Sequence, residues 1–173
     1  MEITNTGKFL GLVRHPLKFR LFLLTKLPSA FFSGLKVVYA DDNQAKVKIN
    51  YRWFTKNPFR STYFACLSMA AEMSTGILAW MSVYGKKPPV SMLVLRTEAN
   101  FLKKATSSTI FTCEDGQAIT EAVDEAYASG KSISFAARST GKNEAGEIVA
   151  EFVITWSFKA KPGIPSIPAT TNG

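Results

Sequence analysis

The feature that most constrains this chain is the segment 63–84, YFACLSMAAEMSTGILAWMSVY, in which sixteen of 22 residues are apolar. Its one charged residue is Glu72, near the middle. A helix that is apolar on every side has no face suited to water, so the segment predicts a helix enclosed by the rest of the domain. A carboxylate inside such a helix is costly unless it is paired, hydrogen-bonded or neutralised. Glu72 is therefore either a functional residue or a structural acid that caps a helix or meets a buried cation.

The size and composition of the chain predict one globular domain with a real core, because its 173 residues are 46% hydrophobic and 20% charged. The formal net charge is +8, and residues 1–36 supply +5 of it through six cations and one acid. This charge favours anionic partners. The sequence has no basic stretch interleaved with aromatics and no nucleic-acid recognition motif, so nucleic-acid binding is not expected.

The cysteines and the histidine exclude some kinds of chemistry. Cys66 and Cys113 have no histidine or further cysteine at ligand spacing, so we expect no metal site and interpret both as small core residues in a reducing, cytoplasmic setting. His15, beside Pro16 in the basic N-terminal region, is expected at the surface rather than as a catalytic base. Segment 63–84 is long enough to span a membrane, but its polar residues and the flanking strand patterns favour a core helix.

The order of the predicted elements defines an α+β domain. Residues 1–33 form a basic helical extension, 34–160 the main domain and 161–173 a loose tail. Within the extension, 8–27 predicts one or two short helices divided by Pro16 and closed by Pro28. We interpret it as an amphipathic helix packed on the domain with its cations in water, and the alternative is a lid or a helix on a membrane surface.

Strand and helix patterns fill the main domain. Strands are predicted at 34–40, 45–51, 90–105, 107–113, 131–140 and 147–159, and a short helix at 117–129. In the last strand Phe152, Ile154, Trp156 and Phe158 share one face. A hairpin, a long helix and then a meander of roughly four strands predict an antiparallel sheet of about six strands wrapped around the helix. One sheet covers only part of such a helix, so another element or another copy of the chain must cover the rest, and a homodimer or a dimer of dimers is the simplest expectation.

The stretch NPFRSTYFACLSMAAE, residues 57–72, resembles the signature of hotdog-fold thioesterases of the phenylacetyl-CoA type. In that signature an asparagine precedes a glycine, a His-Gly-Gly run and, fifteen residues on, an acid; Asn57 and Glu72 have this spacing. The chain departs from it at Arg60, which replaces the first glycine, and at Tyr63-Phe64-Ala65, which replaces His-Gly-Gly. The resemblance covers about residues 34–160 and is strongest to a subgroup with an added N-terminal helical segment.

The resemblance implies hydrolysis of an acyl-CoA or related thioester, with coenzyme A as part of the substrate and no other cofactor. Glu72 would act as general base or nucleophile, the N–H of Phe64 would hold the oxyanion, and Asn57 would orient water or the carbonyl. Candidate substrate contacts are Tyr63, Ala65, Ser68 and Thr75, with Lys103, Lys104, Lys86 and Lys87 as candidates for the phosphates. The same lysines also fit ordinary surface charges.

The side chain of Phe64 would crowd the place where glycine lets a carbonyl approach. A second interpretation is therefore a non-catalytic hotdog protein that binds an acyl chain, a lipid or another apolar ligand.

Overall fold

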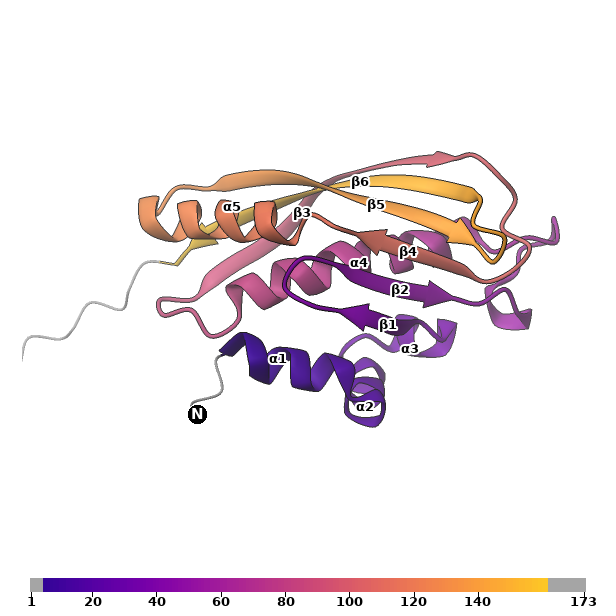
Figure 1. The fold of residues 1–173 in the computed structure, drawn as a ribbon, viewed down its shortest axis with the longest axis horizontal. Helices are drawn as coiled ribbons and strands as arrows, with labels where there is room; N and C mark the ends of the chain where they lie inside the picture. The colour runs from indigo at the N-terminus through magenta and orange to yellow at the C-terminus, as the bar shows by residue number, and fades with distance from the viewer. Residues whose placement is uncertain (1–4, 162–173) are drawn as a thin grey trace, which may run out of the picture.

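The computed structural model describes residues 5–161. The elements follow one another along the chain as α1 (Asn5–Arg14), α2 (Pro16–Lys26), α3 (Pro28–Ser33), β1 (Lys36–Ala40), β2 (Ala45–Ile49), η1 (Trp53–Thr55), α4 (Phe64–Val83), β3 (Val90–Phe101), β4 (Thr109–Cys113), α5 (Gly116–Ser129), β5 (Ile133–Asn143) and β6 (Ile148–Ala160). Figure 1 shows the sheet curving around α4, with α1 to α3 gathered along the lower side of the molecule. The prediction of one long helix and about six strands is confirmed.

The six strands form one antiparallel sheet in the order β1-β2-β4-β5-β6-β3. The pairing of β3 with β6 corrects the predicted meander, because β3 crosses from the helix to the far side of the sheet and pairs with the last strand. β3 therefore forms one edge of the sheet, and β1 forms the other. The contacts of α1 with β1 place helical structure beside the β1 edge.

The core lies between the inner face of the sheet and α4. Phe111, Phe152 and Phe158 are fully buried or nearly so, and the alternation predicted for the last strand is confirmed. On the helix side the facing residues are small, for example Ala71 and Ser74, which lets the sheet approach closely. Ser74 shares a buried hydrogen bond of 2.8 Å with Ser139 of β5, so its polar group is satisfied. Cys66 and Cys113 are buried thiols, as predicted.

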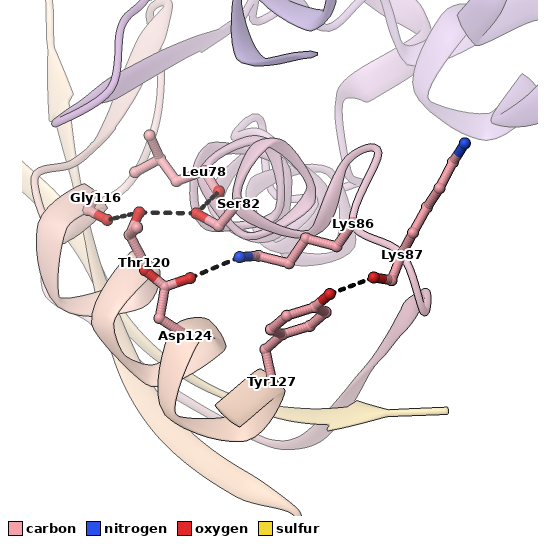
Figure 2. Close-up of polar contacts among 8 residues, drawn as sticks. All are labelled: Leu78, Ser82, Lys86, Lys87, Gly116, Thr120, Asp124 and Tyr127. Atoms are coloured by element: carbon pink, nitrogen blue, oxygen red, sulfur yellow. Dashed lines mark hydrogen bonds and ion pairs between the residues drawn. The ribbon is translucent and has the colours of Figure 1, made fainter. Parts of the chain in front are cut away.

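Helix α5 is attached to the C-terminal half of α4 by polar contacts, which Figure 2 shows. The hydroxyls of Ser82 and Thr120 lie 2.9 Å apart, and Lys86 pairs with Asp124 at 2.6 Å. The hydroxyl of Tyr127 donates to the carbonyl of Lys87. These bonds engage Lys86, one of the lysines considered for a phosphate contact, in holding the fold together.

The N-terminal extension packs against the main domain. Phe9 of α1 contacts the rings of Trp80 and Tyr84 at centroid distances of 5.0 and 5.4 Å, and Phe22 of α2 contacts Trp80 at 5.2 Å. The extension therefore covers the C-terminal half of the α4 face that the sheet leaves open. His15 is exposed and accepts a bond from the N–H of Lys18 at the start of α2, in agreement with its predicted surface position.

Two short elements, α3 and η1, were not predicted. Pro28 does not end the helical region but begins α3, since proline suits the first position of a helix. Gly34 ends α3 with φ 71°, a left-handed conformation that glycine adopts at little cost. The guanidinium of Arg52 lies where a Cβ on Gly34 would be and donates to the carbonyl of Phe32 at 2.9 Å.

Helix α4 is not enclosed on all sides, which corrects the prediction. It is long and apolar enough to cross a membrane by length and composition, but most of its residues are buried against the sheet, α5 and the N-terminal helices, as in a core helix. An open stripe follows one side of it through Ala65, Ser68, Glu72 and Gly76. Glu72 itself is exposed in the single chain. Its own chain therefore leaves the carboxylate accessible, and neither helix capping nor a buried ion pair accounts for it.

Candidate functional site

Glu72 lies at an apolar groove of about 580 Å³ between α4, α2 and the edge strand β3. A volume of this size falls in the range of ligand sites. The groove is lined by Phe19, Phe22, Leu27, Glu72, Met73, Gly76, Ile77, Trp80, Val83, Val90, Met92, Leu93, Val94 and Trp156. Glu72 is the one charged residue of this lining, so an apolar ligand in the groove would meet a single carboxylate.

The carboxylate of Glu72 lies over Gly76, one turn further along α4. A Cβ placed on Gly76 would be 3.3 Å from Glu72 Oε1 and 3.4 Å from the ring of Trp156. The missing side chain at Gly76 therefore makes room for both the acid and the indole. A carboxylate, an indole and a helix backbone meet here without another side chain between them.

Thr75 supports this arrangement from behind. It is fully buried, its hydroxyl accepts a bond of 3.0 Å from Trp156 Nε1, and it donates to the carbonyl of Glu72 at 3.0 Å. Thr75 was predicted to contact substrate, but the hydroxyl of its side chain is engaged within the chain and Thr75 is not part of the groove lining. Thr75 instead holds the Trp156 ring in position beside the acid.

Burial among apolar groups raises the pKa of Glu72 above its ordinary value of 4.5. The side chain is exposed along one side in the single chain, but Met73, Gly76 and Trp156 flank it on the others and displace water. Among residues 5–161, no cation forms an ion pair with Glu72 to offset this effect. The acid is thus unpaired, reachable and a stronger base than a fully hydrated carboxylate.

A second cavity, also of about 580 Å³, lies at the N-terminus of α4. It is lined by Asn57, Pro58, Phe59, Ser61, Thr62, Tyr63, Phe64, Leu67, Phe101, Leu102, Lys103, Lys104 and Ala105. Five predicted site residues, Asn57, Tyr63, Phe64, Lys103 and Lys104, therefore share one cavity. Glu72 is not part of it.

The first turn of α4 leaves backbone donors open at this cavity. The N–H groups of Cys66 and Leu67 donate to the carbonyl of Tyr63 at 2.9 and 3.3 Å. Those of Phe64 and Ala65 have no acceptor among the described residues. Such free N–H groups at a helix start attract a negatively charged oxygen. Phe64 thus keeps the donor for which it was predicted.

The ring of Phe64 forms a wall of the cavity. It packs edge-on against Tyr63 at a centroid distance of 4.9 Å and against Phe101 at 6.3 Å, and it remains 55% exposed. The cavity persists beside it. Ser68 is only partly exposed, and its hydroxyl donates to the carbonyl of Phe64 at 3.0 Å, so it satisfies the helix backbone.

Asn57 shapes the loop before α4. Its side-chain oxygen accepts bonds from the N–H groups of Phe59 and Ser61 at 3.0 and 3.2 Å, and its amide donates to the Ser61 hydroxyl at 3.0 Å. Arg60, at the glycine position of the signature, has φ 59°, the left-handed conformation that glycine would adopt there. The loop therefore keeps a glycine-like backbone without the glycine, and Asn57 is already engaged in that loop.

The two lysines of the cavity differ in their surroundings. Lys103 Nζ lies 2.5 Å from Glu147 Oε1, so its charge is largely neutralised. Lys104 is exposed and forms no ion pair within residues 5–161. Of the two predicted phosphate ligands, Lys104 is the one with a free charge.

One chain does not bring the acid and the donors together. Phe64 and Glu72 are eight residues apart on the same helix, which corresponds to about 12 Å along its axis at 1.5 Å per residue. A water that attacks a carbonyl held at Phe64 must lie within about 3 Å of its base. The groove and the cavity are therefore two half-sites at different heights on α4.

Sequence reasoning missed the residues that complete the groove. Phe19 and Phe22 come from the N-terminal extension and Trp156 from the last strand. The spacing of Phe19 and Phe22 on α2 indicates a shared helix side, but nothing in the sequence shows that this side faces Glu72.

No family model matches the chain, and no curated protein matches it, but solved structures do. A protein of unknown function from Pseudomonas aeruginosa, described as a "probable thioesterase", superposes with a TM-score of 0.71 and 18% identity over 84% of this chain and 97% of its own. A protein of unknown function from Chlorobaculum tepidum gives 0.73 and 13% over 92% and 98%. A thioesterase from P. aeruginosa, studied as a variant, gives 0.63 and 12% over 83% and 94%.

The chain has the hotdog fold. At these identities the likeness establishes the fold and leaves the activity to be argued from the site. The C. tepidum match covers 92% of this chain. Residues 34–160 are a smaller share of the chain than this, so the match extends beyond them.

Proposed function

We propose that this hotdog protein hydrolyses acyl thioesters, such as acyl-CoA, at sites shared between two protomers. The observation that carries the proposal is the unpaired carboxylate of Glu72 in a ligand-sized apolar groove, about 12 Å along α4 from open backbone donors. Each half-site has one part of the machinery for acyl transfer. A two-fold pair with antiparallel α4 helices would place the acid of one protomer at the helix start of the other.

The edge strand β3 supports such a pair. It is twelve residues long and bonds to β6 on one side only within the described chain. Its outward side chains Leu93 and Leu95 are 64% and 55% exposed. A long apolar edge strand is a template for pairing with another strand. Antiparallel pairing of two β3 strands would continue the sheet and bring the groove of each protomer against the other.

In the proposed mechanism the thioester carbonyl enters the cavity at the start of α4. Its oxygen accepts hydrogen bonds from the N–H groups of Phe64 and Ala65, which stabilise the negative charge that develops on it. Glu72 of the partner subunit removes a proton from water as the water oxygen bonds to the carbonyl carbon. The tetrahedral intermediate then collapses and the carbon–sulfur bond breaks. The thiolate takes up the proton held by Glu72, and the carboxylic acid product leaves the site.

The surroundings of the half-sites suit this chemistry. The raised pKa of Glu72 makes it a better proton acceptor at neutral pH. The acyl chain would lie in the apolar groove, and Lys104 would contact a phosphate of coenzyme A. Tyr63 would contact the substrate at the cavity wall, and Asn57 would act through the loop that it shapes, which sets the direction of the first N–H groups of α4.

The test is hydrolysis of a panel of acyl-CoA substrates by the wild type and three variants. Glu72→Gln should lower kcat about 100- to 10,000-fold if Glu72 is the base. Phe64→Pro deletes the donor but should fold, because proline suits the first helical position and Tyr63 already has φ −60° and ψ 132°. We expect a loss of about 100-fold or more. The control Phe64→Ala keeps the N–H and should retain most activity. Hydrolysis that is unchanged in Glu72→Gln would refute the proposal.

The second candidate function, binding of an acyl chain without turnover, is favoured by the bulk of Tyr63 and Phe64 at the cavity. Their packed rings narrow the approach to the donors. In that case the protein would bind a non-hydrolysable acyl-CoA analogue, with no thiol release from any true thioester. Turnover that depends on Glu72 would exclude it.

A further inference from the structure

Helix α2 exposes a ridge of three leucines. Leu17, Leu21 and Leu24 are 75%, 63% and 42% exposed. They are spaced at i, i+4 and i+7, so at about 100° per residue they lie within roughly 60° of one another around the helix. An apolar ridge of this kind on a surface helix is unfavourable in water and marks an interaction face.

The ridge is not needed to hold α2 on the domain. Phe19 and Leu23, on the opposite side, are buried, and Phe22 stacks with Phe19 at 5.8 Å and contacts Trp80. Helix α2 is therefore apolar on two opposite sides. The expectation that its outer side carries only cations in water is incomplete, because the leucines share that side.

Cations border the ridge without acidic neighbours. Residues 5–35 contain five lysines and arginines and no aspartate or glutamate. Lys18 and Arg20 are exposed on α2 on either side of the ridge, and neither of them forms an ion pair within residues 5–161. Arg20 lies 4.5 Å above the ring of Phe31, which fixes its position beside the helix. The surface thus combines exposed leucines with unneutralised positive charge.

We propose that α2 docks on an anionic membrane surface, with Leu17, Leu21 and Leu24 inserted at the level of the lipid headgroups and Lys18 and Arg20 held by acidic lipids. A helix with leucines on one side and flanking cations binds such a surface in its plane. Charge favours this occupant over a second copy of the chain, because two copies of the same basic face would repel each other. The edge strand β3 is moreover a separate apolar surface for self-association.

The inner side of α2 links this surface to the groove, a point that rests on the proposed function. Phe19 and Phe22 line the groove that contains Glu72. Leu27, the residue after α2, lines the same groove and is 47% exposed. The groove therefore adjoins the docking face. The substrate class that fits is a long-chain acyl thioester that partitions into the bilayer and reaches Glu72 past the end of α2.

The test is flotation of the full chain with vesicles of phosphatidylcholine and phosphatidylglycerol at roughly three to one, compared with phosphatidylcholine alone. The wild type should float with the anionic vesicles and lose binding as salt rises. Leu21→Ser/Leu24→Ser should lower partitioning at least about tenfold. Lys18→Gln and Arg20→Gln should each lower it about fivefold. Ile148→Ser, which alters a leucine-sized side chain that is 39% exposed at the start of β6, is the matched control and should bind as the wild type does.

Two results would overturn the docking proposal. One is a wild type that does not float with anionic vesicles. The other is a Leu21→Ser/Leu24→Ser variant that floats as well as the wild type, whether or not its oligomeric state differs from that of the wild type in sedimentation. Hydrolysis of a short, soluble acyl-CoA should be unchanged in the leucine variant. Vesicle binding without any hydrolysis would leave docking standing and refute the thioesterase, so the two proposals fail separately.

Discussion

A shared site predicts that two inactive variants restore activity when they are mixed. Glu72→Gln removes the base and leaves the helix start intact, whereas Phe64→Pro removes a donor and leaves the base intact. In a mixed dimer, one site combines the intact helix start of the first protomer with the intact Glu72 of the second. The other site carries both changes and is inactive.

The activity expected from the mixed variants follows from the helix geometry and from the statistics of dimer formation. The eight residues from Phe64 to Glu72 span about 12 Å, too far for one protomer to supply both groups to one carbonyl. Random reassociation of equal amounts makes half of the dimers mixed, and each mixed dimer has one intact site of two. We expect about a quarter of the wild-type rate, against less than about one hundredth for either variant alone.

The assay follows thiol release from an acyl-CoA with a thiol-reactive dye. Cys66 and Cys113 are buried, and the pKa of the Cys113 thiol is raised to about 12, so the native protein adds little background. The variants carry different affinity tags and are mixed under conditions that exchange subunits. Purification through both tags isolates the mixed dimer, which should reach about half of the wild-type rate.

A doubly tagged dimer that is as inactive as its parents would refute the shared site. Full activity in Phe64→Pro alone would refute the donor role of the Phe64 N–H. A wild type that is monomeric and active would refute the arrangement altogether, because the 12 Å gap would then have to close within one chain.

Further predictions concern single side chains. Since apolar surroundings raise the pKa of Glu72, the folded state holds a proton that the unfolded chain releases. Denaturant titrations should therefore show the wild type losing stability relative to Glu72→Gln as pH rises from 4.5 through the raised pKa. Over the same pH range kcat/KM should increase. Gly76→Ala should raise the free energy of unfolding by up to about 1 kcal/mol through helix propensity. It should nevertheless lower kcat about tenfold, because the added Cβ displaces the carboxylate of Glu72. An unchanged kcat in the variant would contradict this. Arg60→Gly should stabilise the chain by about 1 kcal/mol in urea unfolding, and Arg60→Val should destabilise it, because the position has φ 59°. Lys104→Ala should raise KM about fivefold for acyl-CoA but not for an acyl-pantetheine without phosphates, whereas Lys103→Ala should change KM less because Glu147 already neutralises it.

Much of the fold was predictable from local patterns. The apolar run that became α4, the alternation of β2 and β6, and the turn residues between strands each depend on neighbours in the sequence. The short helix α3 was missed because Pro28 ends one helix and begins the next, and these two effects look alike in sequence. The pairing of β3 with β6 was missed because strand order depends on contacts between residues far apart in the chain.

The candidate site was predictable in its components but not in their arrangement. Glu72, Phe64 and Lys104 lie on cavities, as expected of site residues. The type and spacing of Thr75 do not show that Trp156, 81 residues away in sequence, donates a hydrogen bond to its hydroxyl. Asn57 fits the expected spacing, yet its side chain accepts hydrogen bonds from the N–H groups of Phe59 and Ser61, so it also stabilises the loop before α4.

The sequence by itself determined an apolar central helix that contains one acidic residue, Glu72, and a basic segment rich in leucine and phenylalanine before it, because composition and periodicity are local properties. The separation of about 12 Å between Glu72 and the helix-start donors also follows from the sequence, because it is eight residues of one helix. Only the tertiary structure decided that Glu72 opens onto a groove and that α2 forms a wall of this groove. Those facts depend on which surfaces the sheet and the N-terminal helices cover, and coverage is set by packing between distant segments rather than by any one of them.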